Sequence, residues 1–147
     1  MAAIKLGKNC SINRNTGSYG SPTWTAISLV KDATLNSAKA EADATVRGSE
    51  YEMMVGTMKQ VSLEFEIVED TSDAGYSALN TSYHTGTQID LAVLNGPAAT
   101  SGSTGVRFYG EVMTFNRNEQ LNGIVTRNVT VKPTWPTDGN YPTTITV

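Results

Sequence analysis

Apolar and polar residues alternate along much of this 147-residue chain, and the clearest alternation runs from Lys59 to Glu69. A period of two places successive side chains on opposite faces of a β-strand, so this segment predicts a strand with one buried face. The apolar face consists of Val61, Leu63, Phe65 and Ile67, and the polar face of Ser62, Glu64 and Glu66. We expect the first face to lie on a core and the second to be wet and acidic.

Further strand patterns occur at 4–14, 24–30, 38–46, 89–93, 106–115 and 125–131. In 38–46 the alternation is strict, although most of its apolar positions are alanine, a weak strand former. In 106–115 the phase of the pattern changes near Gly110, which predicts a β-bulge. Segments rich in Gly, Asn, Ser and Pro separate these strands and predict turns and loops.

One segment has helical spacing instead, between Asp73 and Gly86. Asp73 is a suitable N-cap, and Gly86 is placed to end the helix. The residues at near-helical spacing are Ala74, Tyr76, Leu79 and Tyr83. The predicted fold is therefore mainly β: a β-sandwich or open barrel of about seven to eight strands with one flanking α-helix. We expect a single domain over 1–147, with arms at 1–22 and 136–147.

The segment Arg47–Thr57 breaks the alternation and is bracketed by glycines. Its candidate interaction residues are Arg47, Glu50, Tyr51, Met53, Met54 and Val55. A loop with this much apolar surface is expected to be covered by something. Two interpretations stay open at this point: the segment folds back on its own core, or it docks on a neighbouring subunit.

Composition strengthens the β prediction. Charged residues make up 17% of the chain, against about 25% in an average globular protein. Thr, Ser, Asn and Gly take their place, and these residues favour strands and turns. The net charge is −3 and no basic cluster is present. Tight binding of nucleic acid through its phosphates is therefore not expected.

Catalytic and cofactor motifs are missing from the sequence. His84 is the sole histidine and Cys10 the sole cysteine, so neither has the partners that catalysis, zinc binding or a disulfide requires. The acids Glu69, Asp70 and Asp73 suit a helix start better than a calcium loop. We expect no enzyme activity, no cofactor and no metal. Without a signal-peptide core or a membrane-length apolar run, we expect cytoplasmic folding and no membrane anchoring.

Several stretches occur in order between about residues 30 and 134: Val30–Leu35, Glu41–Gly48, Asp73–Tyr76, Ile89–Leu94, Phe115–Glu119 with Leu121, and Val129–Thr134. Together they resemble the major tail tube proteins of long-tailed bacteriophages. The resemblance implies a β-sandwich flanked by one helix, whose subunits join strands into hexameric rings. The rings stack into a tube through which DNA passes without specific binding.

The resemblance also implies roles for particular residues. A long loop of this family reaches the adjacent ring, and Arg47–Thr57 is the matching segment. An acidic lumen would keep DNA off the wall, so Glu64 and Glu66, or else the polar face of 38–46, are expected to line it. The expected partners are further copies of the chain, a tail initiator or tip, and a terminator. The expected location is the virion tail, assembled in the bacterial host cytoplasm.

Two alternatives remain open from the sequence. The first is the inner tube of a contractile tail or of a secretion-type injection machine, which shares this fold. The second belongs to another class, a monomeric β-sandwich that binds a ligand such as carbohydrate. Modules of that class expose aromatic side chains on one strand face, and here Trp24 and Trp135 are the candidates.

Overall fold

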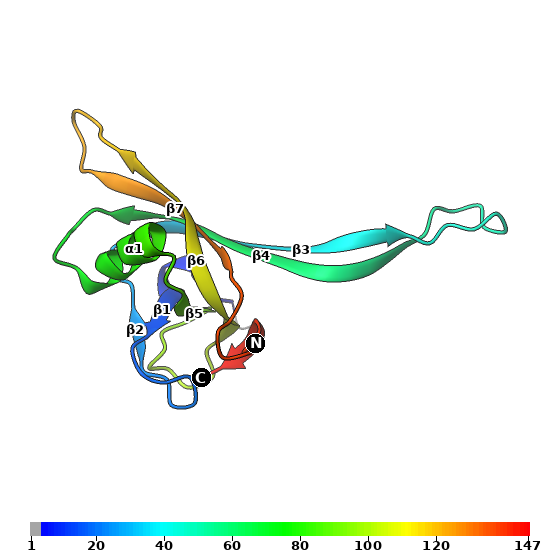
Figure 1. Ribbon diagram of the computed structural model, residues 1–147, viewed down its shortest axis with the longest axis horizontal. Coiled ribbons are helices and arrows are strands. Elements are labelled where there is room, and N and C mark those ends of the chain that lie inside the picture. Colours follow the sequence, from blue (N-terminus) through cyan, green and yellow to red (C-terminus); the bar gives the residue numbers. More distant parts are fainter. Residues whose placement is uncertain (1–3) are drawn as a thin grey trace.

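The computed structural model describes residues 4–147, in which eight strands form one antiparallel sheet accompanied by one α-helix. The strands are β1 (Ser11–Asn15), β2 (Trp24–Ala26), β3 (Val30–Asp43), β4 (Met54–Val68), β5 (Ile89–Leu94), β6 (Thr104–Asn118), β7 (Thr126–Pro133) and β8 (Thr143–Thr146). Their order in the sheet is β2-β1-β5-β6-β7-β4-β3, and β8 pairs with β6 outside this path (Figure 1). The predicted mainly β fold class with one helix is confirmed. Residues 1–3 of the predicted N-terminal arm lie outside the described residues.

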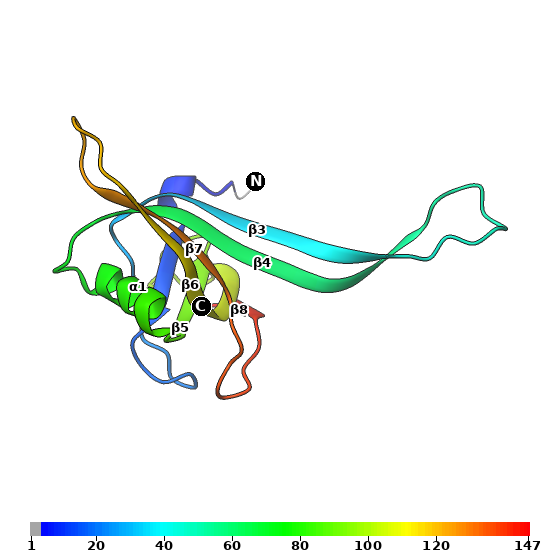
Figure 2. The same cartoon turned by 45° about the horizontal axis from the view of Figure 1, so that its top comes forward.

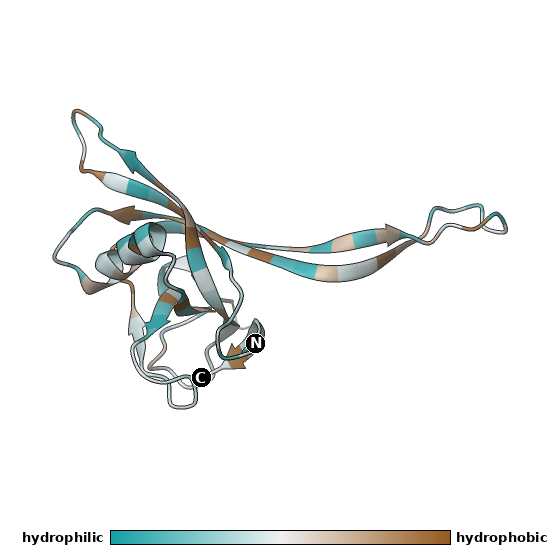
Figure 3. Ribbon diagram, viewed as in Figure 1, coloured by the Kyte–Doolittle hydropathy of each residue, from teal (hydrophilic) through white to brown (hydrophobic). Residues whose placement is uncertain are grey.

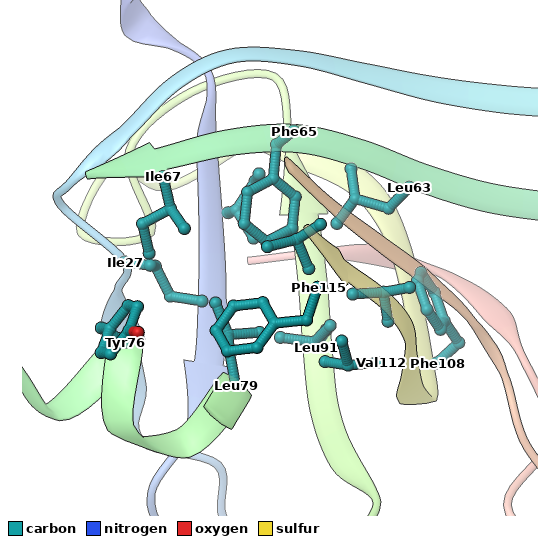
Figure 4. Close-up of a cluster of buried hydrophobic side chains, with 13 residues drawn as sticks. Ile27, Leu63, Phe65, Ile67, Tyr76, Leu79, Leu91, Phe108, Val112 and Phe115 are labelled. Atoms are coloured by element: carbon teal, nitrogen blue, oxygen red, sulfur yellow. The ribbon is translucent and has the colours of Figure 1, made fainter. Parts of the chain in front are cut away.

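The sheet curls around one hydrophobic core, as an open barrel does. Ile12 of β1 and Ile67 of β4 belong to the same buried cluster, although β5, β6 and β7 lie between their strands in the sheet. A flat sheet would hold these side chains far apart, because neighbouring strands are about 4.8 Å apart. Strands β5 and β6 contribute further core residues, among them Leu91, Phe108 and Phe115, as Figure 4 shows.

The helix α1 (Ala74–Thr85) closes the open side of this core. The Asp73 carboxylate accepts a hydrogen bond from the Tyr76 N–H at 3.0 Å, which caps the first turn. Gly86 ends the helix in the left-handed conformation at φ 73°, where a glycine carries no steric penalty. Tyr76 and Leu79 are buried against the sheet. The helix and both of its predicted ends are confirmed.

The strand predicted at 4–14 is only partly correct. Asn9 and Cys10 donate N–H bonds to the carbonyls three residues before them, which makes Gly7–Asn9 a turn of 3₁₀-helix. Strand β1 therefore starts at Ser11. The alternating pattern was misleading here because Gly7 and Asn9 are turn formers in a segment that no strand pairs with.

The strand predicted at 24–30 ends early, at Ala26. The chain leaves β1 there and crosses to β4, beside which β3 begins at Val30. Ile27 lies in the segment that crosses from β1 to β4 and is buried in the core. An apolar residue at this position therefore extends the strand pattern in the sequence, although the strand has already ended. The bulge in β6 is confirmed, but it falls between Val112 and Thr114 instead of at Gly110.

The longest feature of the molecule is the hairpin made by β3 and β4. The two strands pair from Val30↔Ile67 out to Asp43↔Met54, whereas β4 pairs with β7 only from Leu63 to Val68. The rest of the hairpin leaves the body and ends far from it, which both views show (Figures 1 and 2). The strand predicted at 38–46 is thus the outer part of β3, which stops at Asp43.

The predicted loop Arg47–Thr57 needs two corrections. Its last residues belong to β4, which begins at Met54. The interpretation that it folds back on its own core is wrong, because strand pairing carries it away from the body. We call the connecting residues 44–53, together with the strand ends Asp43, Met54 and Val55, the hairpin tip.

Candidate assembly surfaces

The outer half of the β3–β4 hairpin has open edges on both sides. Within the described residues 4–147, β3 pairs only with β4, and β4 has no second partner from residue 54 to 62. An isolated two-stranded hairpin is at best marginally stable in water. Open strand edges are also ready templates for another chain. The hairpin therefore has the geometry of an element that is completed by a neighbour.

The hairpin tip has a defined local shape. The Ala44 N–H donates to the Met53 carbonyl at 2.9 Å, and the Met53 N–H donates to the Thr45 hydroxyl at 3.0 Å. The Ser49 hydroxyl donates to the Tyr51 carbonyl at 2.9 Å. These bonds fix the backbone of the tip, although its apolar side chains are not covered by any of the residues 4–147.

The apolar side chains of the tip are nevertheless in solvent. Tyr51 is 78% exposed, and Met53, Met54 and Val55 are also exposed. Figure 3 shows hydrophobic segments near the far end of the hairpin, separated from the core. The structure thus brings the predicted loop residues, including Arg47 and Glu50, together on one projecting element. An apolar cluster of this kind, bounded by charges, is typical of an interaction surface.

Glu64 and Glu66 lie on the face of the sheet that points away from the core. Glu64 stands between Thr34 of β3 and Thr130 of β7, and Glu66 is opposite Asn128 of β7. Since β7 pairs with β6 in the same way, a small-residue polar face extends over four strands, β3-β4-β7-β6. This face has the wet and acidic character predicted for the polar side of the strand at 59–69.

The polar residues of 38–46 point the other way. Lys39 is the cross-strand partner of Lys59, which shares a strand face with Val61 and Leu63. Near the root of the hairpin, Lys39 is therefore on the core side of the sheet and Glu64 on the opposite side. The two predicted sets of lumen residues belong to opposite faces of one element.

A buried ion pair, which the sequence reading missed, anchors the loop between β1 and β2. Arg107 of β6 donates from Nε and Nη2 to the two carboxylate oxygens of Asp90 on β5, at 3.1 and 2.6 Å. Both residues are buried. Burial works against the charged guanidinium, but the hydrogen bonds and charge of Asp90 outweigh it and raise the pKa of Arg107. The signal was available, since Arg107 interrupts the apolar run Val106–Phe108.

This ion pair is extended by aromatic rings. The Arg107 guanidinium lies 3.6 Å from the centre of the Tyr19 ring and donates to the Tyr19 carbonyl at 3.1 Å. Tyr19 stacks on Tyr109, whose hydroxyl donates to Asp138 at 2.6 Å. Burial, with that hydrogen bond, raises the pKa of Tyr109 to about 12. The loop before β2 and the loop before β8 are thus fixed to the same patch of sheet.

A second polar cluster supports the hairpin of β6 and β7. Glu69 accepts hydrogen bonds from the Tyr76 hydroxyl at 2.8 Å and from Arg127 at 3.1 Å, and pairs with Arg117 at 3.3 Å. The Tyr76 bond comes first among the causes that lower the pKa of Glu69, and the two arginines add to it against partial burial. At the tip of this hairpin Leu121 is 99% exposed. The cluster sets the direction in which this second projection leaves the body.

The residues considered for chemistry lie apart. Cys10 is exposed, and His84 in the last turn of α1 is exposed with its ring 5.1 Å from that of Tyr83. Between residues 4 and 147 the structure contains no group of three or more His, Cys, Asp or Glu side chains placed to hold a metal ion. In the same part of the chain, no helix has the length and apolar character needed to cross a membrane.

Solved structures that resemble this chain in fold include subunits of viral and virus-like tails and a chain of a baseplate. No protein-family model and no curated protein sequence matches the chain. The tail of an empty gene transfer agent particle, refined with C6 symmetry, has a subunit that matches with a TM-score of 0.72 at 13% identity, over 90% of this chain and 96% of that one. The SPP1 tail tube matches with a TM-score of 0.72 at 11% identity, over 88% of this chain and 75% of that one.

A third match lies in a related kind of assembly. The six-fold symmetrised baseplate of the anti-feeding prophage contains a chain that matches with a TM-score of 0.66 at 8% identity, over 99% of this chain and 97% of that one. At these identities the likeness concerns the fold. The chain has the tail-tube fold, and the resemblance read from its sequence is confirmed at that level.

Proposed function

We propose that this chain is a structural virion protein that assembles into stacked, hexameric rings and so builds the tail tube through which phage DNA passes. The observation that carries the proposal is the β3–β4 hairpin, whose edges and apolar tip are uncovered within the described chain. The tail-tube fold supports it, as does the C6 symmetry of the gene transfer agent tail. In this role the chain is not an enzyme and needs no cofactor.

The polar face with Glu64 and Glu66 lines the lumen in this proposal. Carboxylates on the wall repel phosphate within roughly one Debye length, about 8–10 Å. The small neutral side chains around them, such as Thr130 and Asn128, offer DNA little to bind. DNA then slides past without a specific contact. A charge on the opposite face, such as Lys39, would be separated from the lumen by the sheet.

The hairpin tip, with Arg47, Glu50, Tyr51, Met53, Met54 and Val55, docks on the adjacent ring. Burying its apolar side chains supplies a driving force of about 25 cal/mol for each Å² removed from water. The ends of the stack need other proteins, an initiator at the tail tip and a terminator at the far end. The tube forms in the bacterial host cytoplasm and ends up in the virion tail.

The assembly role is tested by removing the apolar side chains of the tip. We expect the double variant Tyr51→Ser and Met53→Ser to keep the wild-type melting temperature, because the tip does not contact the core. The same variant should lose rings and tubes in electron micrographs, if necessary with a tail-tip seed present. A matched control is Ile4→Ser and Leu6→Ser, which removes exposed apolar residues elsewhere. Unchanged tube formation by the tip variant would refute this role for the tip.

A second candidate function is the inner tube of a contractile tail or injection machine, and the anti-feeding prophage match favours it. It differs from the first in needing a sheath on its outer surface. Co-sedimentation of purified tubes with a contractile-tail sheath protein would support the contractile assignment. The ligand-binding module is less well supported, because it calls for exposed aromatic rings together on one strand face. The Trp24 ring lies 4.9 Å from the Arg107 guanidinium, and Trp135, although exposed, lies on the loop before β8.

A further inference from the structure

A groove runs along the root of the β3–β4 hairpin, where β7 stops accompanying β4. It comprises two adjoining hollows of about 710 and 650 Å³. Its lining is mixed, with Val61 and Ala38 from the hairpin, Pro133 at the end of β7, and Pro142 before β8 as apolar elements. The assembly role proposed above does not account for this groove.

The charge of the groove is opposite to that of the protein. Lys39 and Lys59 line it from the core side of the sheet, and Lys132 lines it from the opposite side, where Glu111 is its cross-strand partner. Among the residues that the structure describes, no carboxylate lines the groove itself. Three of the 11 Lys and Arg residues of a chain with net charge −3 are thus concentrated here. Moreover, Lys39 and Lys59 stand directly opposite each other on neighbouring strands. Like charges in that arrangement are destabilising, and a carboxylate between them would relieve the repulsion.

The floor of the groove offers backbone groups as well. Pairing between β4 and β7 ends at Leu63↔Val131, and β7 itself ends at Pro133, which has no N–H to donate. The stretch of β4 from Lys59 to Val61 is consequently an open strand edge alongside the three lysines. An extended peptide segment can add to such an edge through main-chain hydrogen bonds. The groove therefore suits an acidic, partly apolar stretch of polypeptide.

Charge distinguishes the exposed apolar segments of this chain as candidate occupants. The tip of the β6–β7 hairpin exposes Leu121 and Ile124, but its carboxylate Glu119 already pairs with Arg117 at 2.9 Å. The N-terminal segment 4–10 exposes Ile4 and Leu6, but its charged residues are Lys5 and Lys8, which the groove lysines would repel. The hairpin tip exposes Tyr51 and Met53 among three carboxylates and one guanidinium. Those charged residues of the tip are Asp43, Glu50, Glu52 and Arg47.

We propose that the groove of one copy of this chain receives the hairpin tip of a second copy. A copy cannot fill its own groove, because the length of the hairpin separates its tip from its root (Figure 2). The contact therefore joins two different patches on successive molecules, and such a head-to-tail contact repeats without limit. The inference rests on the proposed tube function and names the receiving surface for the tip.

Charge reversal tests the pairing. We expect Glu50→Lys with Glu52→Lys, and separately Lys59→Glu with Lys132→Glu, to raise the concentration needed for assembly about tenfold or more. Chains carrying all four changes should assemble at close to the wild-type concentration, because the attraction is restored with its signs exchanged. Lys5→Glu with Lys8→Glu is the matched control for net charge and should assemble normally. Failure of the four-fold variant to recover, with each pair impaired, would overturn the tip–groove contact.

Disulfide trapping tests the contact without requiring tubes. In a Cys10→Ser background, one chain carries Gly48→Cys in the tip, where an added Cβ meets nothing within 4 Å, and another carries Thr144→Cys beside the groove. Mixing under mild oxidant should yield the covalent heterodimer, whereas replacing the second chain by Thr81→Cys on α1 should not. Tubes in electron micrographs without the tip–groove heterodimer would reject this inference and leave the tube function standing. A trapped heterodimer in a sample that never forms tubes would support the tip–groove contact and contradict the tube function.

Nucleic acid is the competing occupant of a lysine groove. We expect a fluorescently labelled duplex oligonucleotide to bind wild-type chain and the Lys59→Glu, Lys132→Glu variant equally weakly. Tight binding that only the wild-type chain shows, and that falls steeply with salt, would mean that the groove holds phosphate. That outcome would overturn the proposal of an acidic peptide segment.

Discussion

Arg107 shows how a single buried charge organises one end of this molecule. Its guanidinium pairs with Asp90, lies on the ring of Tyr19 and holds the Tyr19 carbonyl. The loop between β1 and β2 has few apolar side chains of its own to bury, so it depends on this residue for its position. The pair is therefore a structural anchor and not a candidate for chemistry.

We predict that Arg107→Leu lowers the free energy of unfolding by about 3–5 kcal/mol, because it leaves the Asp90 carboxylate buried without its partner. Chemical denaturation measures this difference. The control Lys31→Leu removes an exposed charge from β3 and should change stability by no more than about 0.5 kcal/mol. If the two variants had equal stability, Arg107 would not be the anchor of the loop.

Glu69 makes stability depend on acid. Its pKa is lowered in the folded state from a reference value of 4.5, so its contribution is complete above pH 4.5 and is lost as the pH falls below that value. We predict that the unfolding free energy of wild type falls more steeply than that of Glu69→Gln from about pH 5 downward. Denaturant titrations at a series of pH values measure both curves. Parallel curves for the two proteins would contradict the assignment.

Among the elements, β6 is the most tightly constrained, because it pairs with β5, β7 and β8. At Gly105 an added Cβ would lie within 1.7 Å of the Val93 carbonyl oxygen, a backbone atom that cannot move aside. We predict that Gly105→Ala destabilises the fold by about 3 kcal/mol or more. Gly20→Ala, where the space is open, is the matched control and should be nearly neutral in thermal unfolding. A neutral Gly105→Ala would mean that β6 and β5 separate easily.

Sequence patterns predicted some elements well and others poorly, for a physical reason. Strand β4 and helix α1 follow from local signals: alternation around Phe65, and caps at Asp73 and Gly86. The end of β2 and the length of β3 depend on which strand lies alongside, and alternation carries no information about that. The sequence marks Arg107 as unusual within an apolar run, but its pairing with Asp90 and the lysine groove become visible only in the fold, because their residues lie on different strands.

For the whole molecule, the division into a compact body and a projecting hairpin is the central property. The body has a core of its own, while the outer hairpin has open edges and exposed apolar residues such as Tyr51 and Met58. The tip residues could be predicted as an interaction segment because their apolar side chains are close together in the sequence itself. Their separation from the core was not predictable, since it follows from pairing that continues out to Asp43↔Met54.

The most direct test of the tube role is electron cryomicroscopy of the purified chain, alone and with a tail-tip seed, followed by helical reconstruction. We expect hollow tubes of stacked six-fold rings, with the face bearing Glu64 and Glu66 on the lumen and each hairpin reaching a neighbouring copy. A chain that stays monomeric at high concentration and with the seed would contradict the account. So would tubes whose lumen is lined by the opposite face of the sheet.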